Sequence, residues 1–147
     1  MSLLPRKGLL AIAAVIDVAL NARERPVSAR KLAARHNLPP RHLEPVLQAL
    51  VHDGILRGVR GPHGGYALAR ERGRIGIDEI VRAAATVRDR DEDAIASPLI
   101  AEVVSPAVAE AERAFSGALS RINVDDLVRR VETGSRPEGP AEIDFTI

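Results

Sequence analysis

Residues 28–70 decide the fold, and they read SARKLAARHNLPPRHLEPVLQALVHDGILRGVRGPHGGYALAR. Ser28 is suited to cap the helix formers that follow it, and Asn37 is suited to end them. Pro39 and Pro40 then begin another helix, because a first helical turn does not need the N–H that proline lacks. The stretch therefore predicts a short helix, a tight connection and a second helix.

This second helix has one apolar face, and a hairpin follows it. Its apolar residues are spaced as on one side of a helix: Leu43, Val46, Leu47 and Leu50. We expect Pro45 to distort the first turns, because a proline inside a helix removes a hydrogen bond. After Gly54, residues 55–60 and 66–70 predict two short strands, and the turn GPHGG supplies glycines that accept positive φ.

Helices are also predicted on both sides of this stretch. In the first, at about residues 6–23, apolar residues recur at helical spacing with Asp17 and Asn21 elsewhere around the helix: Leu9, Ile12, Ala13, Ile16 and Leu20. A short helix near residues 75–84 follows the hairpin, and a long one begins at about Pro98. Asn123 caps a last helix, which Gly134 ends.

The order of these elements is that of a winged helix-turn-helix. The expected fold class is mainly α, with a two-stranded β-hairpin wing and a long C-terminal helix. A chain of 147 residues has room for one domain, or for a small domain with an appended helix. We predict the winged helix-turn-helix at residues 1–86, the long-helix region at 87–133, and a mobile or loosely docked tail at 134–147, which is rich in proline, glycine and charge.

Charge is divided unevenly along the chain. Residues 1–76 contain 13 Lys or Arg and 5 Asp or Glu, a formal charge of +8, whereas residues 77–147 contain 8 and 15, a formal charge of −7. A basic half joined to an acidic half predicts a polyanion-binding module beside a region that does not bind. The alternative is that the charges are unevenly distributed over a solvent-exposed surface that binds no polyanion.

Composition excludes several classes of protein. The absence of cysteine excludes disulfides, thiolate nucleophiles and cysteine-ligated zinc or iron–sulfur clusters. The four histidines lack a short metal-ligand spacing, so we predict no metal and no other cofactor. The sequence contains neither a nucleophile paired with a base nor a phosphate-binding loop, so no feature of it supports an enzyme. No apolar run reaches the roughly 18 residues of a membrane helix, so we expect a cytoplasmic protein with no membrane partner.

The basic half offers side chains suited to DNA. At the start of a recognition helix, arginine can bond guanine, glutamine adenine, and glutamate cytosine. Cap hydroxyls and cations suit phosphates, and a wing can follow the backbone or enter the minor groove. The predicted DNA-binding residues are Ser28, Arg30, Lys31, Pro40, Arg41, His42, Glu44, Gln48, Arg57, Arg60, His63, Gly64, Gly65 and Tyr66. The alternatives are a solvated helix face and a tyrosine that only anchors its strand.

An apolar seam follows the long C-terminal helix. Its members alternate spacings of four and three, as a and d positions do in a coiled coil: Val104, Val108, Ala111, Phe115, Ala118 and Ile122. Dimerisation through this seam and packing within one chain explain the spacing equally well.

The stretch quoted above, from ARKLAARHN onward, together with IGIDEIVRA at 75–83, resembles the Rrf2 family of bacterial winged-helix transcription regulators. This group contains the iron–sulfur cluster regulator, the nitric-oxide-sensitive repressor and the cysteine-metabolism repressor. The resemblance implies a homodimer that binds an imperfect palindrome in double-stranded DNA. It also implies that Glu44 is a base-contacting residue, that Arg60 is the wing arginine, and that the long helix is the dimerisation helix.

The sequence departs from this family at two places. Cluster-binding members carry three cysteines in the region that corresponds to residues 88–106, and this chain has none. Leu9 and Leu10 stand where many members have a basic residue and a tyrosine, which argues against phosphate contacts from that part of the first helix.

Together these features predict a homodimeric, sequence-specific transcription regulator of the repressor type, which acts at a palindromic operator without an iron–sulfur cluster. A small-molecule effector is left open. The alternative is a winged-helix adaptor that binds a protein instead of a specific DNA sequence. Salt distinguishes the two, because phosphate-driven binding weakens steeply as ionic strength rises.

Overall fold

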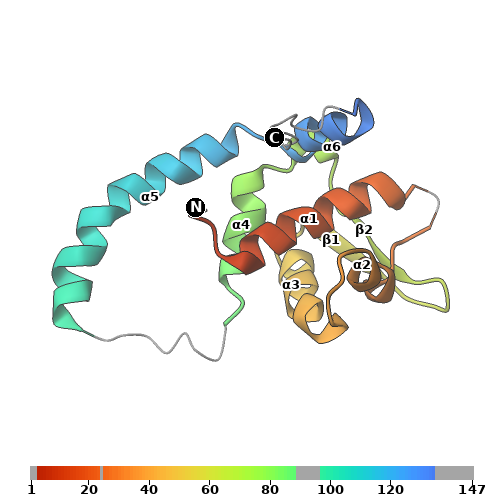
Figure 1. Ribbon diagram of the computed structural model, residues 1–147, viewed down its shortest axis with the longest axis horizontal. Coiled ribbons are helices and arrows are strands. Elements are labelled where there is room, and N and C mark those ends of the chain that lie inside the picture. The colour runs from red at the N-terminus through yellow and green to blue at the C-terminus, as the bar shows by residue number, and fades with distance from the viewer. Residues whose placement is uncertain (1–2, 24, 89–96, 135–147) are drawn as a thin grey trace, which may run out of the picture.

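The computed structural model describes residues 3–23, 25–88 and 97–134. Its elements are α1 (Arg6–Asn21), α2 (Ala29–Arg35), α3 (Pro40–His52), β1 (Leu56–Val59), β2 (Gly65–Leu68), the 3-10 turn η1 (Arg72–Arg74), α4 (Ile77–Ala85), the π-helical turn η2 (Ile100–Val104), α5 (Ser105–Ser120) and α6 (Val124–Glu132). Figure 1 shows α1 to α4, α6 and the hairpin packed together, while most of α5 reaches away from them. The mainly α winged helix-turn-helix fold is confirmed.

Local sequence signals begin and end the helices as expected. Ser28 caps α2, since its Oγ accepts a hydrogen bond from the backbone N–H of Lys31 at 3.2 Å. Asn37 follows α2 with a φ of 55°, a left-handed conformation that asparagine tolerates. The side chain of Asn123 caps α6 by accepting a backbone N–H at 2.9 Å. Gly134 follows that helix with a φ of 68°.

The hairpin is joined to the chain that precedes α2. β1 and β2 are antiparallel, with Leu56 opposite Leu68. Val27 exchanges two backbone hydrogen bonds with Tyr66, at 2.9 and 2.8 Å. Because this bridge fixes the segment before α2 against β2, the start of α2 and the wing keep one spatial relation.

Aliphatic side chains from α1 to α4, the hairpin and α6 form the core. The predicted face of α3 is buried and is therefore confirmed: Leu43, Val46, Leu47 and Leu50. Pro45 lies inside α3 on its exposed side. Val124 and Val128 of α6 join the same core. The domain boundaries after residues 86 and 133 remain predictions, but α6 packs with the first of these units.

The packed face of α1 differs from its most obvious apolar stripe. The helix buries another set of residues: Gly8, Ala11, Ala14, Val15, Asp17 and Val18. Leu9 is 47% exposed, and Ile16 and Leu20 are half-buried. α1 packs against α4, and the small alanine side chains allow the two helices to approach closely. The predicted stripe therefore lies at the side of the core.

The long C-terminal helical segment begins at Pro98, as predicted, but a π-helical turn interrupts it before α5. Residues 100–104 form a π-helical turn, so Val104 of the predicted seam precedes α5. Pro106 gives the physical reason, because a proline lacks the N–H of a helical hydrogen bond and clashes with the carbonyl four residues earlier. A wider turn just before the proline relieves that clash.

The same helix also ends before the seam does. α5 stops at Ser120, and Ile122 lies in the connection to α6, so its predicted helical position is wrong. The backbone oxygen of Ile122 accepts a hydrogen bond from the N–H of Ile77 at 2.9 Å, and its side chain packs against the core. These contacts with the start of α4 draw Ile122 away from the helical seam.

None of the described helices combines the length and the apolar character needed to cross a bilayer. Of the predicted tail, Gly134 alone belongs to the described residues, and residues 135–147 lie outside them. Residues 89–96, between α4 and η2, also lie outside them.

Candidate nucleic-acid interface

The exposed side of α3 carries the residues predicted to read bases. All of them are exposed, and they alternate along the helix with the buried leucine face: Pro40, Arg41, His42, Glu44 and Gln48. This helix has 13 residues, and the residues on its polar side are exposed to solvent. A helix with such a face fits the major groove, where its first turns reach base edges.

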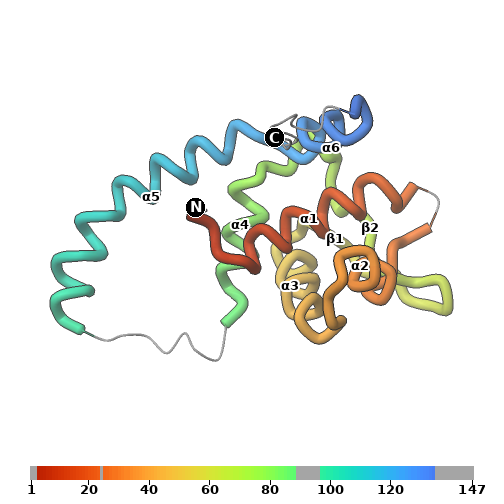
Figure 2. Tube along the Cα trace, viewed as in Figure 1, coloured from red at the N-terminus to blue at the C-terminus, as the bar shows by residue number. Residues whose placement is uncertain are grey.

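The start of α2 lies beside the tip of the wing (Figure 2). A cavity of about 220 Å³ between them brings together Ser28 and Lys31 of α2 with His63 and Gly64 of the wing. The sequence predicted these residues separately, and the structure places them at one site. Arg25 lines the same cavity and was missed, because it stands in a polar run between helices and not on a predicted element.

The two adjacent wing glycines have a structural role inside the protein. Gly65 has a φ of 157°, and a Cβ there would lie 2.4 Å from the backbone oxygen of Val27. A Cβ at Gly64 would lie 2.2 Å from the backbone oxygen of Val59. Close backbone approach within the protein thus explains both glycines, and their contact with DNA remains a prediction.

Tyr66 links the wing to α3. The residue is half-buried and packs against the core, which supports its role as the anchor of β2. Its hydroxyl also accepts a long hydrogen bond from Nε2 of Gln48 at 3.4 Å. The two residues therefore lie side by side where the helix and the wing meet.

A second basic groove, of about 560 Å³, runs from α3 to α1. Its basic side chains come from three segments: Arg6 and Lys7 of α1, Arg41 and His42 of α3, and Arg88 after α4. Nζ of Lys7 also donates a hydrogen bond to the backbone oxygen of Val87. Sequence analysis missed the two cations of α1, which precede the leucines at 9 and 10 by one turn. Two adjacent cations at the start of the first helix were the only signal in the sequence, and their position beside α3 requires the fold.

Cations of the predicted interface differ from those that support the fold. Four arginines of α2, α3 and the wing are exposed and form no ion pair with any described residue: Arg30, Arg41, Arg57 and Arg60. Other arginines are paired: Arg35 with Asp17, Arg70 with Glu79 and Arg72 with Asp125. Exposed cations without an ion pair contribute a positive field, which attracts a polyanion.

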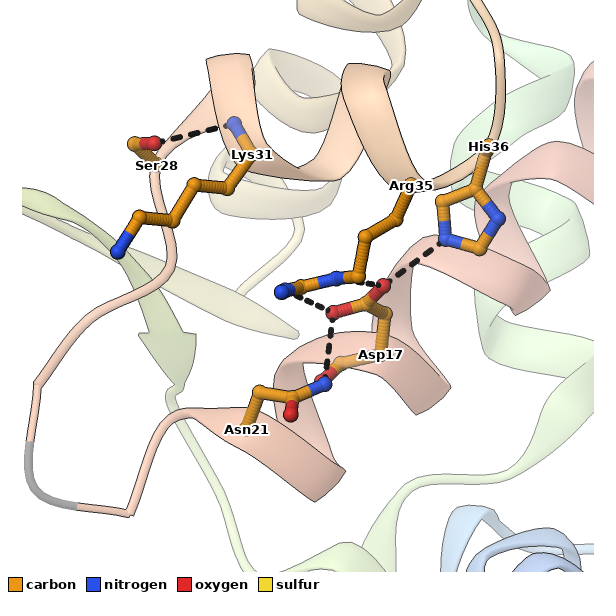
Figure 3. Close-up of polar contacts among 6 residues, drawn as sticks. All are labelled: Asp17, Asn21, Ser28, Lys31, Arg35 and His36. Carbon is orange, nitrogen blue, oxygen red and sulfur yellow. Dashed lines mark hydrogen bonds and ion pairs between the residues drawn. The ribbon is translucent and has the colours of Figure 1, made fainter.

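A buried carboxylate fixes α2 against α1. Asp17 is 7% exposed, and Arg35 donates to its two oxygens at 2.9 and 2.6 Å. Asn21 and His36 each lie 3.0 Å from the same carboxylate. Burial raises the pKa of Asp17, but the hydrogen bonds and charge of its neighbours, Arg35 above all, hold that pKa below its ordinary value. Figure 3 shows this cluster at one end of α2 and the Ser28 cap at the other.

α5 presents apolar side chains that the described chain leaves uncovered. None of its 16 residues is buried, and Val108 is 46% exposed. Val108, Ala111 and Phe115 line a groove of about 490 Å³, which α4 and the segment before α1 complete. Ala118, also a member of the predicted seam, is exposed. Contact of this surface with a second copy remains a prediction.

Comparison with known proteins agrees with this geometry. Residues 4–130 match the family described as Rrf2, iron-dependent transcriptional regulator. Over 80 residues the chain is 39% identical to the HTH-type transcriptional regulator IscR of Xenorhabdus nematophila and 36% identical to that of Cronobacter sakazakii. Each match covers 54% of this chain and 49% of the relative, so the chain spans about half the length of these curated relatives.

Solved structures resemble the chain over most of its length. IscR of T. potens superposes with a TM-score of 0.69 at 25% identity and covers 95% of both chains. CymR (YrzC), the global cysteine regulator of B. subtilis, superposes with a TM-score of 0.64 at 24% identity, over 88% of this chain and 98% of that one. The likeness to CymR concerns the fold.

An iron–sulfur cluster held by cysteine does not fit the residues of this chain. Cysteine thiolates hold iron–sulfur clusters, and the sequence contains no cysteine. Within the part of the chain that the structure describes, no three His, Asp or Glu side chains come together as metal ligands.

Proposed function

The chain belongs to the Rrf2 family, and from that premise we propose that it is a transcription regulator that binds double-stranded DNA. The observation that carries the proposal is the set of exposed arginines of α2, α3 and the wing that form no ion pair with any described residue. In the proposed complex α3 enters the major groove, where Arg41, Glu44 and Gln48 meet base edges. The start of α2 contacts phosphates, and the wing lies at the minor groove.

The proposed regulator is a homodimer that joins two such heads through α5. A large apolar surface on an isolated helix is stabilised when a second helix covers it, and Phe115 and Val108 lie on such a surface. A two-fold dimer places its recognition helices about 34 Å apart, one turn of B-DNA, and this predicts a palindromic operator. The protein acts in the bacterial cytoplasm as a repressor, because a dimer seated on a promoter blocks the polymerase.

Selection of genomic fragments by the purified full-length protein, without added ligand or metal, tests this function. The expected result is one palindromic motif, bound with an affinity that falls steeply between about 50 and 200 mM salt. Arg41→Gln is expected to relax the base preference at one position of each half-site, since arginine and glutamine favour different bases.

Two results would contradict the proposal. Recovery of unrelated fragments with equal affinity would leave only non-specific attraction to phosphates. Recovery of no DNA, together with a protein partner that binds the α3 and wing face, would favour the adaptor function.

A further inference from the structure

A cavity of about 570 Å³ lies between α1 and α6, on the side of α1 where its most obvious apolar stripe is found. Aliphatic side chains of both helices form its walls: Ala13, Ile16, Leu20, Leu127 and Val131. Small-molecule sites in proteins have volumes of about 300–1,000 Å³, mostly apolar walls and a few polar groups. The stripe that the core leaves half-buried therefore lines a space of the size that a small ligand occupies.

Polar groups at the edge of the cavity determine the charge of such a ligand. Asp17 reaches the cavity, but its carboxylate already accepts hydrogen bonds from three side chains and is balanced by Arg35. Arg130 of α6 lines the cavity as well, and its guanidinium has no hydrogen bond or ion pair with any described residue. Because Arg35 neutralises Asp17, Arg130 is left as the uncompensated charge among the described residues at the cavity, which favours an anion.

We propose that this cavity binds a small organic acid with an apolar body. The body packs against Ile16, Leu20 and Leu127, and the carboxylate lies between Arg130 and His36. Arginine binds carboxylates through paired, charge-assisted hydrogen bonds, which makes Arg130 the main determinant of specificity.

The position of His36 connects this site to DNA binding, a step that rests on the proposed function. His36 immediately follows α2, lines the cavity and lies 3.0 Å from Asp17. A ligand carboxylate that binds His36 competes with Asp17 for it and loosens the end of α2 from α1. The other end of α2 carries Ser28 and Lys31 of the proposed interface (Figure 3), so the bound acid lowers the affinity for DNA.

Titration of the full-length protein with 4-phenylbutyrate, followed by the NMR signals of its backbone amides, tests the site without DNA. We expect saturable shifts at Ala13, Leu127 and Val131. 4-Phenylbutan-1-ol has the same apolar body without the charge, and we expect it to bind at least about fivefold more weakly. Equal affinities of the acid and the alcohol would overturn the assignment of an anion site.

Two arginine variants form a matched pair for this titration. Arg130→Gln removes the cation of the cavity and is expected to weaken 4-phenylbutyrate binding about fivefold or more. Arg129→Gln makes the same change one residue earlier, where the side chain pairs with Asp125 outside the cavity, and is expected to leave the affinity unchanged. Equal losses in the two variants would show a general charge effect and overturn the proposal.

Two further measurements complete the test. Phe145→Glu changes the segment that follows Gly134; a clear rise in 4-phenylbutyrate affinity would assign the cavity to that segment and overturn the proposal of a separate ligand. In a DNA-binding assay on the selected operator, 4-phenylbutyrate is expected to weaken the wild-type complex, and the same effect on the Arg130→Gln complex is expected to need about fivefold more of the acid or more. Ligand binding without any effect on operator affinity would overturn the link to regulation. Failure to select an operator would instead contradict the proposed function, while the NMR titration still decides the site.

Discussion

The winged helix and α5 are stabilised in different ways. In the winged helix, side chains such as Leu32, Leu43 and Leu47 have no exposed surface. α5 is longer than α2 or α4, yet it buries no residue, and Val103 beside it is 57% exposed. Because most helical stability in proteins comes from tertiary packing, the winged helix is complete within one chain, whereas in our proposal α5 gains further packing from a second copy.

The largest effect of a single truncation is expected in the winged helix. Leu47→Ala removes a fully buried side chain and is expected to lower the free energy of unfolding by about 2–5 kcal/mol. Val103→Ala, a truncation next to α5 outside the predicted seam, is expected to change it by less than about 0.5 kcal/mol. Urea unfolding measures both. Equal losses would show that the segment before α5 is packed as tightly as the core.

A charge in the groove of α5 is expected to affect assembly. Phe115→Glu places a carboxylate in the groove and is expected to weaken the dimer about a hundredfold or more, because Arg82 of the same groove is already paired with Asp78 and the new charge is left uncompensated. Gly117→Glu adds the same charge to the same helix where nothing lies within 4 Å, and it is expected to leave the dimer intact. Sedimentation equilibrium measures both. A Phe115→Glu protein that remains fully dimeric would place the interface elsewhere.

Sequence predicted the winged helix more accurately than the C-terminal half, for physical reasons. Helix caps such as Ser28 and Asn123 depend only on residues close to them in the sequence. The same is true of the helical spacing of the apolar residues on α3. The face of α1 depends on how closely α4 approaches, and the end of α5 depends on contacts of Ile122 with the start of α4. Such contacts join distant parts of the chain, so they cannot be predicted from the spacing of apolar residues along one helix.

The candidate site shows the same limit. The exposed residues of α3 follow from its period, so the sequence predicted them. The grouping of Arg25 with the wing and of Arg6 with α3 requires the tertiary fold. The burial of Asp17 also escaped prediction, because its partner Arg35 comes from another helix.

Asp17 links the stability of the winged helix to pH. Asp17→Asn removes the negative charge that Arg35 and His36 contact. The substitution is expected to lower the free energy of unfolding by about 2 kcal/mol at pH 7. The pKa of Asp17 is lowered in the folded protein, so its contribution is present above the unfolded value of about 4 and is lost as pH falls through the folded value. Thermal unfolding measured across pH should therefore show a difference in melting temperature between wild type and variant that becomes smaller below about pH 4. A difference that stays constant down to pH 2 would contradict this account.

The smallest effect is expected at an exposed arginine of the wing, where binding changes and folding does not. Arg60→Ala removes an unpaired cation and is expected to weaken operator binding about fivefold and to reduce the salt slope by about 1, while the unfolding free energy stays within about 0.5 kcal/mol of wild type. Arg74→Ala is the matched control, because it removes the same charge from an exposed residue outside the proposed interface, which pairs with Glu71. Fluorescence anisotropy with labelled operator across a salt series measures both. An Arg60→Ala protein with wild-type affinity would remove the wing arginine from the interface. Equal losses in the two variants would mean that the net charge of the basic half, and not the particular face of α2, α3 and the wing, attracts the DNA.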